Sequence, residues 1–124
     1  MSCLNILLVD DRTENLNFLT DYLIHHGHRI ACSTSGITAL EVMKRQLPDV
    51  CLLDLEMPGM DGREVLSRMK ADPQLARVPV VIVSAHAAQD IEEECLEAGA
   101  IGVMSKPLGL KKVLEFLRQF QPLE

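Results

Sequence analysis

Aromatic residues are scarce in this chain of 124 residues, which has no tryptophan, one tyrosine and three phenylalanines. Because 48% of the residues are nevertheless hydrophobic, the core must be built from aliphatic side chains and methionine. A chain of this length and composition fits one domain with a core that needs neither disulfides nor a structural metal.

Basic clusters are also absent. Lysine and arginine number 12 against 18 acidic residues, and the formal net charge is −6. The basic residues form no run and do not alternate with aromatic residues, so we expect no direct binding of nucleic acid.

The sequence contains no C-x-x-C pair, and its four cysteines lie far apart. This spacing argues against a disulfide framework and against a zinc site. Because Cys3, Cys32 and Cys51 stand in apolar or β-like stretches, we expect reduced, half-buried thiols, and we expect Cys95 in the core. No signal-peptide pattern opens the chain, and no apolar run approaches membrane-spanning length, so we expect a cytoplasmic protein outside the membrane.

Short apolar runs alternate along the chain with amphipathic segments of helical spacing. The predicted strands are Leu4–Val9, Arg29–Ser33, Val50–Asp54, Val80–Val83 with Ser84 at its end, and Ile101–Ser105. The predicted helices carry Leu16 to Leu23 (stopping near Gly27), Gly36–Gln46, Gly62–Lys70, Ile91 to Ala98, and Leu110 to Phe120. Strands without polar alternation are covered on both faces, which predicts an α/β protein with a doubly wound, five-stranded parallel sheet, (βα)5.

Polar side chains stand at the ends of four predicted strands. The first strand runs into Asp10 and Asp11, the third ends in Asp54, the fourth ends in Ser84, and Lys106 follows the fifth. Because the carboxyl ends of parallel strands meet at one edge of a sheet, and ligands bind there, we expect these side chains to lie together.

The chemistry of this set follows from its charge. Three clustered carboxylates repel one another unless a cation joins them, and hard oxygen ligands favour Mg²⁺. With Mg²⁺ and Lys106 included, the formal charge is zero, which suits a pocket that receives a phosphoryl group. Asp54 can then act as the nucleophile, while Ser84 and Lys106 hold the phosphoryl oxygens.

Four motifs that span nearly the whole chain resemble those of bacterial response-regulator receiver domains of the CheY-like kind. They are LLVDD (7–11), LLDLEMPGMDG (52–62), VIVSA (81–85) and SKP (105–107). The resemblance implies a flavodoxin-like, CheY-like fold and a single receiver domain over residues 1–124. It also implies a two-component phosphorelay, in which Asp54 accepts a phosphoryl group from a histidine kinase, a histidine phosphotransfer protein or a small phosphodonor.

The resemblance further implies the metal ligands. Asp11 and Asp54 would ligate Mg²⁺, with Mn²⁺ as an alternative, Asp10 would act mainly through water, and the backbone carbonyl of Glu56 would complete the site. Such a domain is a signalling switch, and its only chemistry is its own phosphorylation and dephosphorylation.

The same resemblance implies that Ser84, Ala85 and Lys106 bind the phosphoryl group. The small side chain of Ala85 would leave access to that group. The Lys106–Pro107 peptide bond would be cis, a geometry that proline makes accessible. The side chains of Glu56 and His86 would flank the path of attacking water and tune the lifetime of the phosphoryl group.

One position departs from the family pattern. Receivers usually carry an aromatic residue three positions before the lysine, and here Val103 is aliphatic, so an aromatic rotamer switch cannot operate. The resemblance places the output or partner surface on the segments 91–98, 101–105 and 110–120, where a homodimer could also form. Candidate contacts there are Glu93, Lys111, Lys112 and Arg118.

Three alternatives remain at this point. A pseudo-receiver would bind partners without phosphorylation. A haloacid-dehalogenase-like phosphatase would use a similar aspartate, but its D-x-D motif is replaced here by Asp54-Leu55-Glu56. A flavodoxin-like cofactor binder would need a phosphate-binding loop after the first strand, where the acidic pair stands.

Three histidines, His25, His26 and His28, lie around the end of the first predicted helix and are interpreted as residues suited to a helix C-terminus. The sequence fits a stand-alone receiver and a module of a larger regulator equally.

Overall fold

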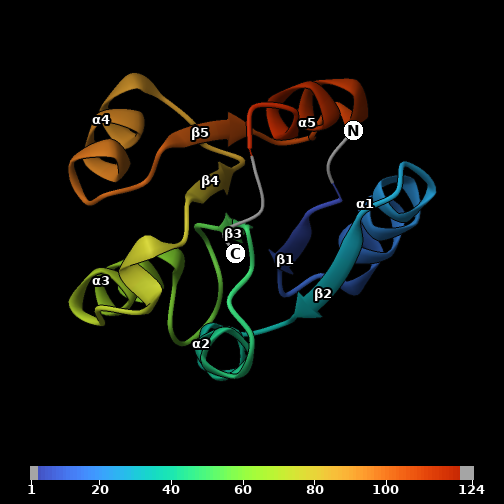
Figure 1. Ribbon diagram of the computed structural model, residues 1–124. Helices are drawn as coiled ribbons and strands as arrows, with labels where there is room; N and C mark the ends of the chain where they lie inside the picture. Colours follow the sequence, from blue (N-terminus) through green and yellow to red (C-terminus); the bar gives the residue numbers. More distant parts are fainter. Residues whose placement is uncertain (1–2, 121–124) are drawn as a thin grey trace.

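The computed structural model describes residues 3–120, and its strands form one parallel sheet in the order β2-β1-β3-β4-β5 (Figure 1). The strands are β1 (Asn5–Val9), β2 (Arg29–Ser33), β3 (Val50–Asp54), β4 (Val80–Ser84) and β5 (Gly102–Ser105). The helices are α1 (Thr13–His25), α2 (Gly36–Arg45), α3 (Gly62–Ala71), α4 (Gln89–Glu97) and α5 (Leu110–Leu117), with a 3₁₀ turn, η1, at Leu75–Arg77. This architecture confirms the predicted (βα)5 fold.

The strand order reverses between β1 and β3, because β2 lies on one side of β1 and all later strands lie on the other. The carboxyl ends of β1 and β3 therefore flank the point at which open parallel sheets bind their ligands. β1 ends at Val9, directly before Asp10, and β3 ends at Asp54.

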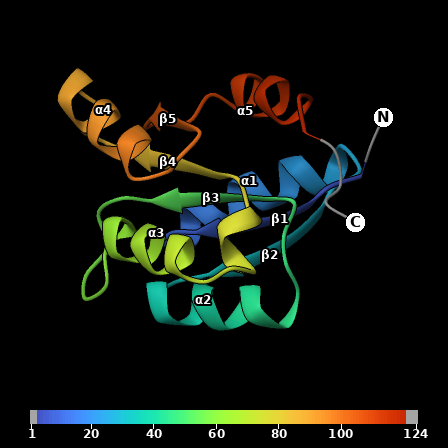
Figure 2. The same ribbon diagram turned by 60° about the vertical axis from the view of Figure 1, so that its left-hand side comes forward.

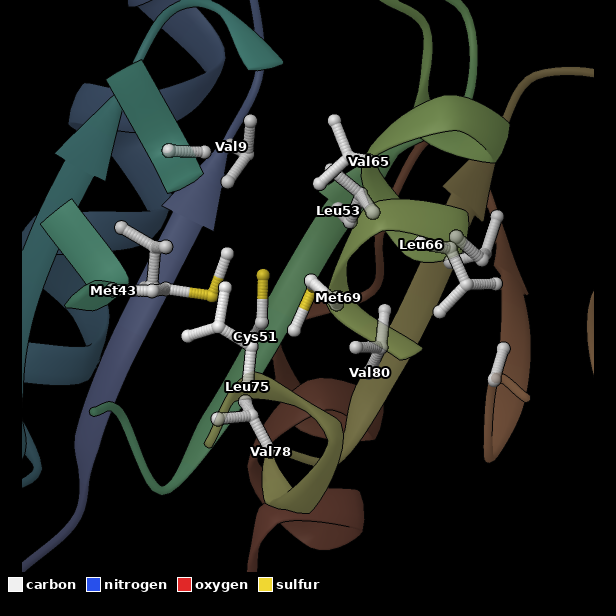
Figure 3. Close-up of a cluster of buried hydrophobic side chains, with 14 of the residues drawn as sticks. Val9, Met43, Cys51, Leu53, Val65, Leu66, Met69, Leu75, Val78 and Val80 are labelled. Atoms are coloured by element: carbon white, nitrogen blue, oxygen red, sulfur yellow. The ribbon is translucent and has the colours of Figure 1, made fainter. Parts of the chain in front are cut away.

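Helices cover both faces of the sheet, as Figure 2 shows for α2 and α3 on one side and α5 on the other. Met43 of α2, together with Val65 and Met69 of α3, packs in a buried cluster against the sheet (Figure 3). Leu23 of α1 and Leu117 of α5 belong to a second cluster on the opposite face. The core is thus aliphatic and methionine-rich, as the composition predicted.

The interior strands β3 and β4 are buried at every residue. The edge strand β2 differs, because Arg29, Ala31 and Cys32 are exposed. The prediction that every strand is covered on both faces is therefore wrong for β2, and also for the other edge strand, β5, in which three residues are half-buried and Ser105 is exposed. An edge strand has only one neighbouring strand, and the helices beside it cover mainly the interior of the sheet.

The four cysteines are free thiols, as predicted, but their burial differs from the prediction. Cys3 and Cys32 are exposed, whereas Cys51 and Cys95 are buried, so the expectation of half-buried thiols at Cys3, Cys32 and Cys51 is wrong. Cys51 stands at the centre of the sheet, where burial raises the pKa of its thiol to about 12. The prediction that Cys95 belongs to the core is confirmed.

The first helix ends at His25, near Gly27 as predicted. Gly27 has a φ of +93°, a conformation that glycine adopts readily. Nδ1 of His26 lies 3.0 Å from the carbonyl oxygen of Tyr22, which fits the expected role at a helix end. His28 does not fit that interpretation. It lies beyond the helix, is buried, and its Nδ1 accepts a hydrogen bond from the backbone N–H of Leu4 at 3.2 Å.

The predicted bounds of the elements differ only at their ends. Leu4 and Ile101 lie just outside β1 and β5, and Phe120 lies beyond α5. The Phe120 ring still packs against Phe116, with 5.4 Å between the ring centroids. Within residues 3–120, no helix is both long enough and apolar enough to cross a membrane.

Candidate functional site

Asp54 stands at the end of β3 and is almost fully buried, with 2% of its surface exposed. The apolar run Val50–Leu53 forms the centre of the sheet and carries the carboxylate to its edge. Oδ1 of Asp54 accepts a hydrogen bond from the backbone N–H of Glu56 at 3.3 Å, and Oδ2 lies 3.1 Å from Nζ of Lys106. The strand therefore places a reactive acid beside a cation.

Asp10 and Asp11 follow β1 and lie beside Asp54. Asp10 is buried and accepts hydrogen bonds from the Arg12 N–H (2.9 Å) and from Nδ2 of Asn15 (3.3 Å). Asp11 is exposed, and one carboxylate oxygen from each of the three acids lies within 4.8 Å of the others. The structure thus brings together the three carboxylates that the sequence predicted.

Lys106 is shared between two of these acids, because its Nζ also lies 3.4 Å from Oδ2 of Asp10. Burial raises the pKa of Asp54; the hydrogen bond and charge of Lys106 oppose this rise, and the charge of Asp10 adds to it. Burial alone would lower the pKa of Lys106, but its hydrogen bond to Asp54 and the charges of both acids raise it overall. Lys106 is therefore a stable cation in a pocket where Asp54 gains a proton more readily than a free aspartate.

The net negative charge of the cluster favours binding of a divalent cation. Three carboxylates against one ammonium carry a formal charge of −2. Carboxylate oxygens at this spacing form the hard donor set that Mg²⁺ prefers, and one exposed acid keeps the site open to water. The residues present therefore fit the predicted ion.

The turn after β3 holds the segment between Asp54 and α3 in a fixed path. Met57 is buried, and Gly59 has a φ of +78° that permits the sharp turn. The N–H of Gly62 donates to the carbonyl of Leu55 at 2.9 Å, and the side chain of Asp61 caps α3. The backbone of Glu56 is thereby kept next to the cluster of acids.

Ser84 ends β4 and is fully buried. Its hydroxyl donates to Oε2 of Glu56 at 2.8 Å and accepts from the backbone N–H of His86 at 3.0 Å. Ala85 lines the pocket that contains Asp54, and the side chains of Ala85 and His86 are exposed. The bond between Ser84 and Glu56 was not predicted, because nothing in the local sequence fixes the side-chain direction of a loop glutamate.

The end of β5 completes the site. The N–H of Lys106 donates to the carbonyl of Ser84 at 3.0 Å, and the Lys106–Pro107 bond is cis, in agreement with the expectation. Val103 is half-buried and packs against the cluster that Met43 and Met69 form beneath the sheet. Position 103, where receivers usually carry an aromatic switch residue, therefore holds an aliphatic side chain.

A cavity of about 640 Å³ opens beside the acids, between α1 and the segment that leads into α5. Its polar lining consists of Asp10, Glu14, Asn15, Asp54 and Lys106, and the rest is mainly apolar. Phe18 of α1 stands at its wall and is 68% exposed. The helical pattern gave no sign of this cavity, since Phe18 lies off the apolar face of α1.

The candidate contact residues on α4 and α5 are all exposed: Glu93, Lys111, Lys112 and Arg118. Glu94, beside Glu93, forms a two-point ion pair with Arg63 of α3, at 2.9 and 3.2 Å. The three consecutive glutamates of α4, Glu92 to Glu94, are all exposed to solvent, and Glu94 is paired with α3.

Comparison with known proteins gives a consistent result. The sequence model of the response regulator receiver domain matches residues 6–118. Sporulation initiation phosphotransferase F of Bacillus subtilis is 32% identical over 119 residues, which are 96% of this chain and 94% of that protein. The response regulator PleD of Caulobacter vibrioides is 38% identical over 103 residues, which cover 83% of this chain but 23% of PleD.

A solved structure shares both the fold and part of the sequence. It is the receiver domain of sensor histidine kinase PA1611 from Pseudomonas aeruginosa, described with a magnesium ion coordinated in its active site cleft. The TM-score is 0.86 at 29% identity, with 96% of this chain and 98% of that chain covered.

Proposed function

The chain belongs to the response-regulator receiver family of signalling domains, and from this premise we propose that Asp54 is its phosphoacceptor. The observation that supports this proposal most directly is the contact between the buried Asp54 carboxylate and Lys106, at 3.1 Å, next to two further acids. Family membership favours this function over a phosphatase and over a flavodoxin-like cofactor binder. The proposed receiver domain covers residues 1–124.

The transfer is a displacement at phosphorus. One Asp54 oxygen attacks the phosphorus of a phosphohistidine or a small acyl phosphate. The new O–P bond forms as the bond to the donor breaks, and the donor atom keeps the electron pair. A histidine nitrogen then takes a proton from solvent, whereas an acyl phosphate donor leaves as its carboxylate. Lys106 stabilises the charge on the phosphoryl oxygens, and the small Ala85 leaves the approach open.

The ion that fits the site is Mg²⁺, with Mn²⁺ as an alternative. Asp11, Asp54 and the backbone carbonyl of Glu56 would hold it, and Asp10 would act mainly through water. When bound, it neutralises the acids and the transferring phosphoryl oxygens. The residues of the chain then orient the phosphoryl group and keep Lys106 next to Asp54.

Dephosphorylation of Asp54 is the reverse step. Water attacks the acyl phosphate of Asp54 and releases inorganic phosphate, at a rate set partly by the side chains of Glu56 and His86.

The protein that donates the phosphoryl group is a histidine kinase or a histidine phosphotransfer protein in the cytoplasm. The output partner, or a second copy of the chain, binds the face formed by α4, β5 and α5.

The test is the mass of the intact protein after incubation with acetyl phosphate, with and without Mg²⁺. A gain of about 80 Da, one phosphoryl group, is expected with Mg²⁺ and is expected to be absent in Asp54→Asn. A protein that gains no phosphoryl group from acetyl phosphate, even with rapid sampling, would favour the pseudo-receiver alternative.

A further inference from the structure

The hydroxyl group of Ser84 is already fully engaged in this structure. Its one proton is donated to Oε2 of Glu56 at 2.8 Å, while its oxygen accepts the N–H of His86 at 3.0 Å. Ser84 is 0% exposed, so water has no access with which to replace either partner. The contact with Glu56 is charge-assisted, and such hydrogen bonds are stronger than those between neutral groups.

A phosphoryl group on Asp54 would need the same proton. Phosphoryl oxygens only accept hydrogen bonds, and a serine hydroxyl has a single proton to donate. Ser84 therefore cannot hold Glu56 and a phosphoryl oxygen at the same time. The Glu56 carboxylate also adds a negative charge near a group that becomes dianionic.

We propose that Glu56 is a positioning residue. It holds the Ser84 hydroxyl in the orientation found without a phosphoryl group on Asp54, and so opposes the orientation in which Ser84 would bind the phosphoryl oxygens. This inference rests on the proposed function of Asp54. It differs from an effect on attacking water, because Glu56 acts through the hydroxyl of Ser84.

The restraint is reversible because of where Glu56 stands. Its backbone is fixed by the hydrogen bond from its N–H to Asp54, but its side chain is exposed. When Ser84 turns away, water can therefore solvate the released carboxylate. The two orientations of Ser84 then differ by a free energy small enough for a phosphoryl group to reverse.

The test is a titration of the Mg²⁺-loaded protein with beryllofluoride, a stable phosphoryl mimic, followed by ¹⁹F NMR. Glu56→Ala is expected to bind the mimic about three- to tenfold more tightly than the wild type, because Ser84 no longer has to leave an acceptor. Glu14→Ala removes another exposed acid from the wall of the same cavity and is expected to change the affinity less than about twofold.

A double-mutant cycle separates the hydrogen bond from the charge of Glu56. If Glu56 acts through Ser84, Glu56→Ala must improve affinity more in the wild type than in Ser84→Ala. An equal improvement in both backgrounds, or none in the wild type, would overturn the inference. The rate of adduct formation with acetyl phosphate, measured on the same four proteins, provides a second readout.

The two proposals fail in different ways. If the wild type binds no more beryllofluoride than Asp54→Asn does, then Asp54 is not the phosphoacceptor, and the role of Glu56 is overturned with it. If the wild type binds and Glu56→Ala binds no more tightly, only the role of Glu56 is overturned.

Discussion

Gly62 lies so close to Asp54 that a β-carbon at position 62 would come within 2.6 Å of the Asp54 carbonyl oxygen. The same β-carbon would lie 2.8 Å from the α-carbon of Leu55. Both contacts are with backbone atoms, which cannot turn aside as a flexible side chain can. The turn after β3 can therefore return to the end of the strand only with glycine at position 62.

Gly62→Ala is accordingly expected to lower the free energy of unfolding by about 1–3 kcal/mol, the usual cost of overpacking a tight contact. It should also slow phosphorylation, because the backbone next to Asp54 must move. Urea denaturation and the rate of adduct formation with acetyl phosphate measure the two effects.

Gly102→Ala is the matched control, since its added β-carbon would meet only the Phe116 ring at 3.8 Å, an ordinary contact. Its free energy of unfolding should change by no more than about 0.5 kcal/mol. Equal stability of the two variants would contradict the close approach at Gly62.

Asp54→Asn is expected to stabilise the fold at neutral pH by about 1 kcal/mol, in the range typical for relieving a strained functional site. The physical reason is that burial, only partly opposed by Lys106, raises the pKa of Asp54. The contribution of Asp54 to stability is full below the pKa of an unfolded aspartate, about 3.9. It is lost as pH rises through the pKa of Asp54 in the folded protein.

The advantage of Asp54→Asn over the wild type should therefore grow from about pH 4 to pH 7, as measured by urea unfolding at each pH. Asp21→Asn, at an exposed position on α1, should show no such trend. A stabilisation that stays the same at every pH would disprove this explanation.

His28 supplies the opposite dependence on pH. Burial, with a smaller effect of the nearby His26, lowers the pKa of His28, and its Nδ1 accepts the Leu4 N–H. A lowered pKa means that stability is present above the unfolded histidine value, about 6.5, and is lost as pH falls through the folded pKa.

His28→Asn keeps an acceptor near the Leu4 N–H but cannot be protonated, so its unfolding free energy should fall less below about pH 6.5 than that of the wild type. His25→Asn, at an exposed position, serves as the control and should follow the wild type. A pH dependence in His28→Asn equal to that of the wild type would refute the assignment.

The acids and the lysine of the site could be predicted because their positions follow from the fold. Once the apolar runs are interpreted as parallel strands, Asp54 and Lys106 must meet at the same edge of the sheet. Their contact at 3.1 Å confirms that expectation. The family motifs added the cis bond before Pro107, which no periodic pattern indicates.

The features that were missed depend on side-chain direction or on strand order. The bond from Ser84 to Glu56 joins residues 28 positions apart, and the direction of a loop side chain leaves no periodic pattern in the sequence. The exposure of Cys32 follows from the place of β2 at the edge, which is set by the crossover to β3 and not by the composition of β2.

The most direct test of the central claim is to locate the phosphoryl group. The protein is phosphorylated with acetyl phosphate and Mg²⁺, treated with borohydride, which reduces an aspartyl phosphate to homoserine, and analysed by peptide mass spectrometry. We expect homoserine at position 54, with Asp10 and Asp11 unchanged in the same sample. Homoserine at position 10 or 11, or a phosphoryl group that resists reduction, would contradict the assignment of Asp54 as the phosphoacceptor.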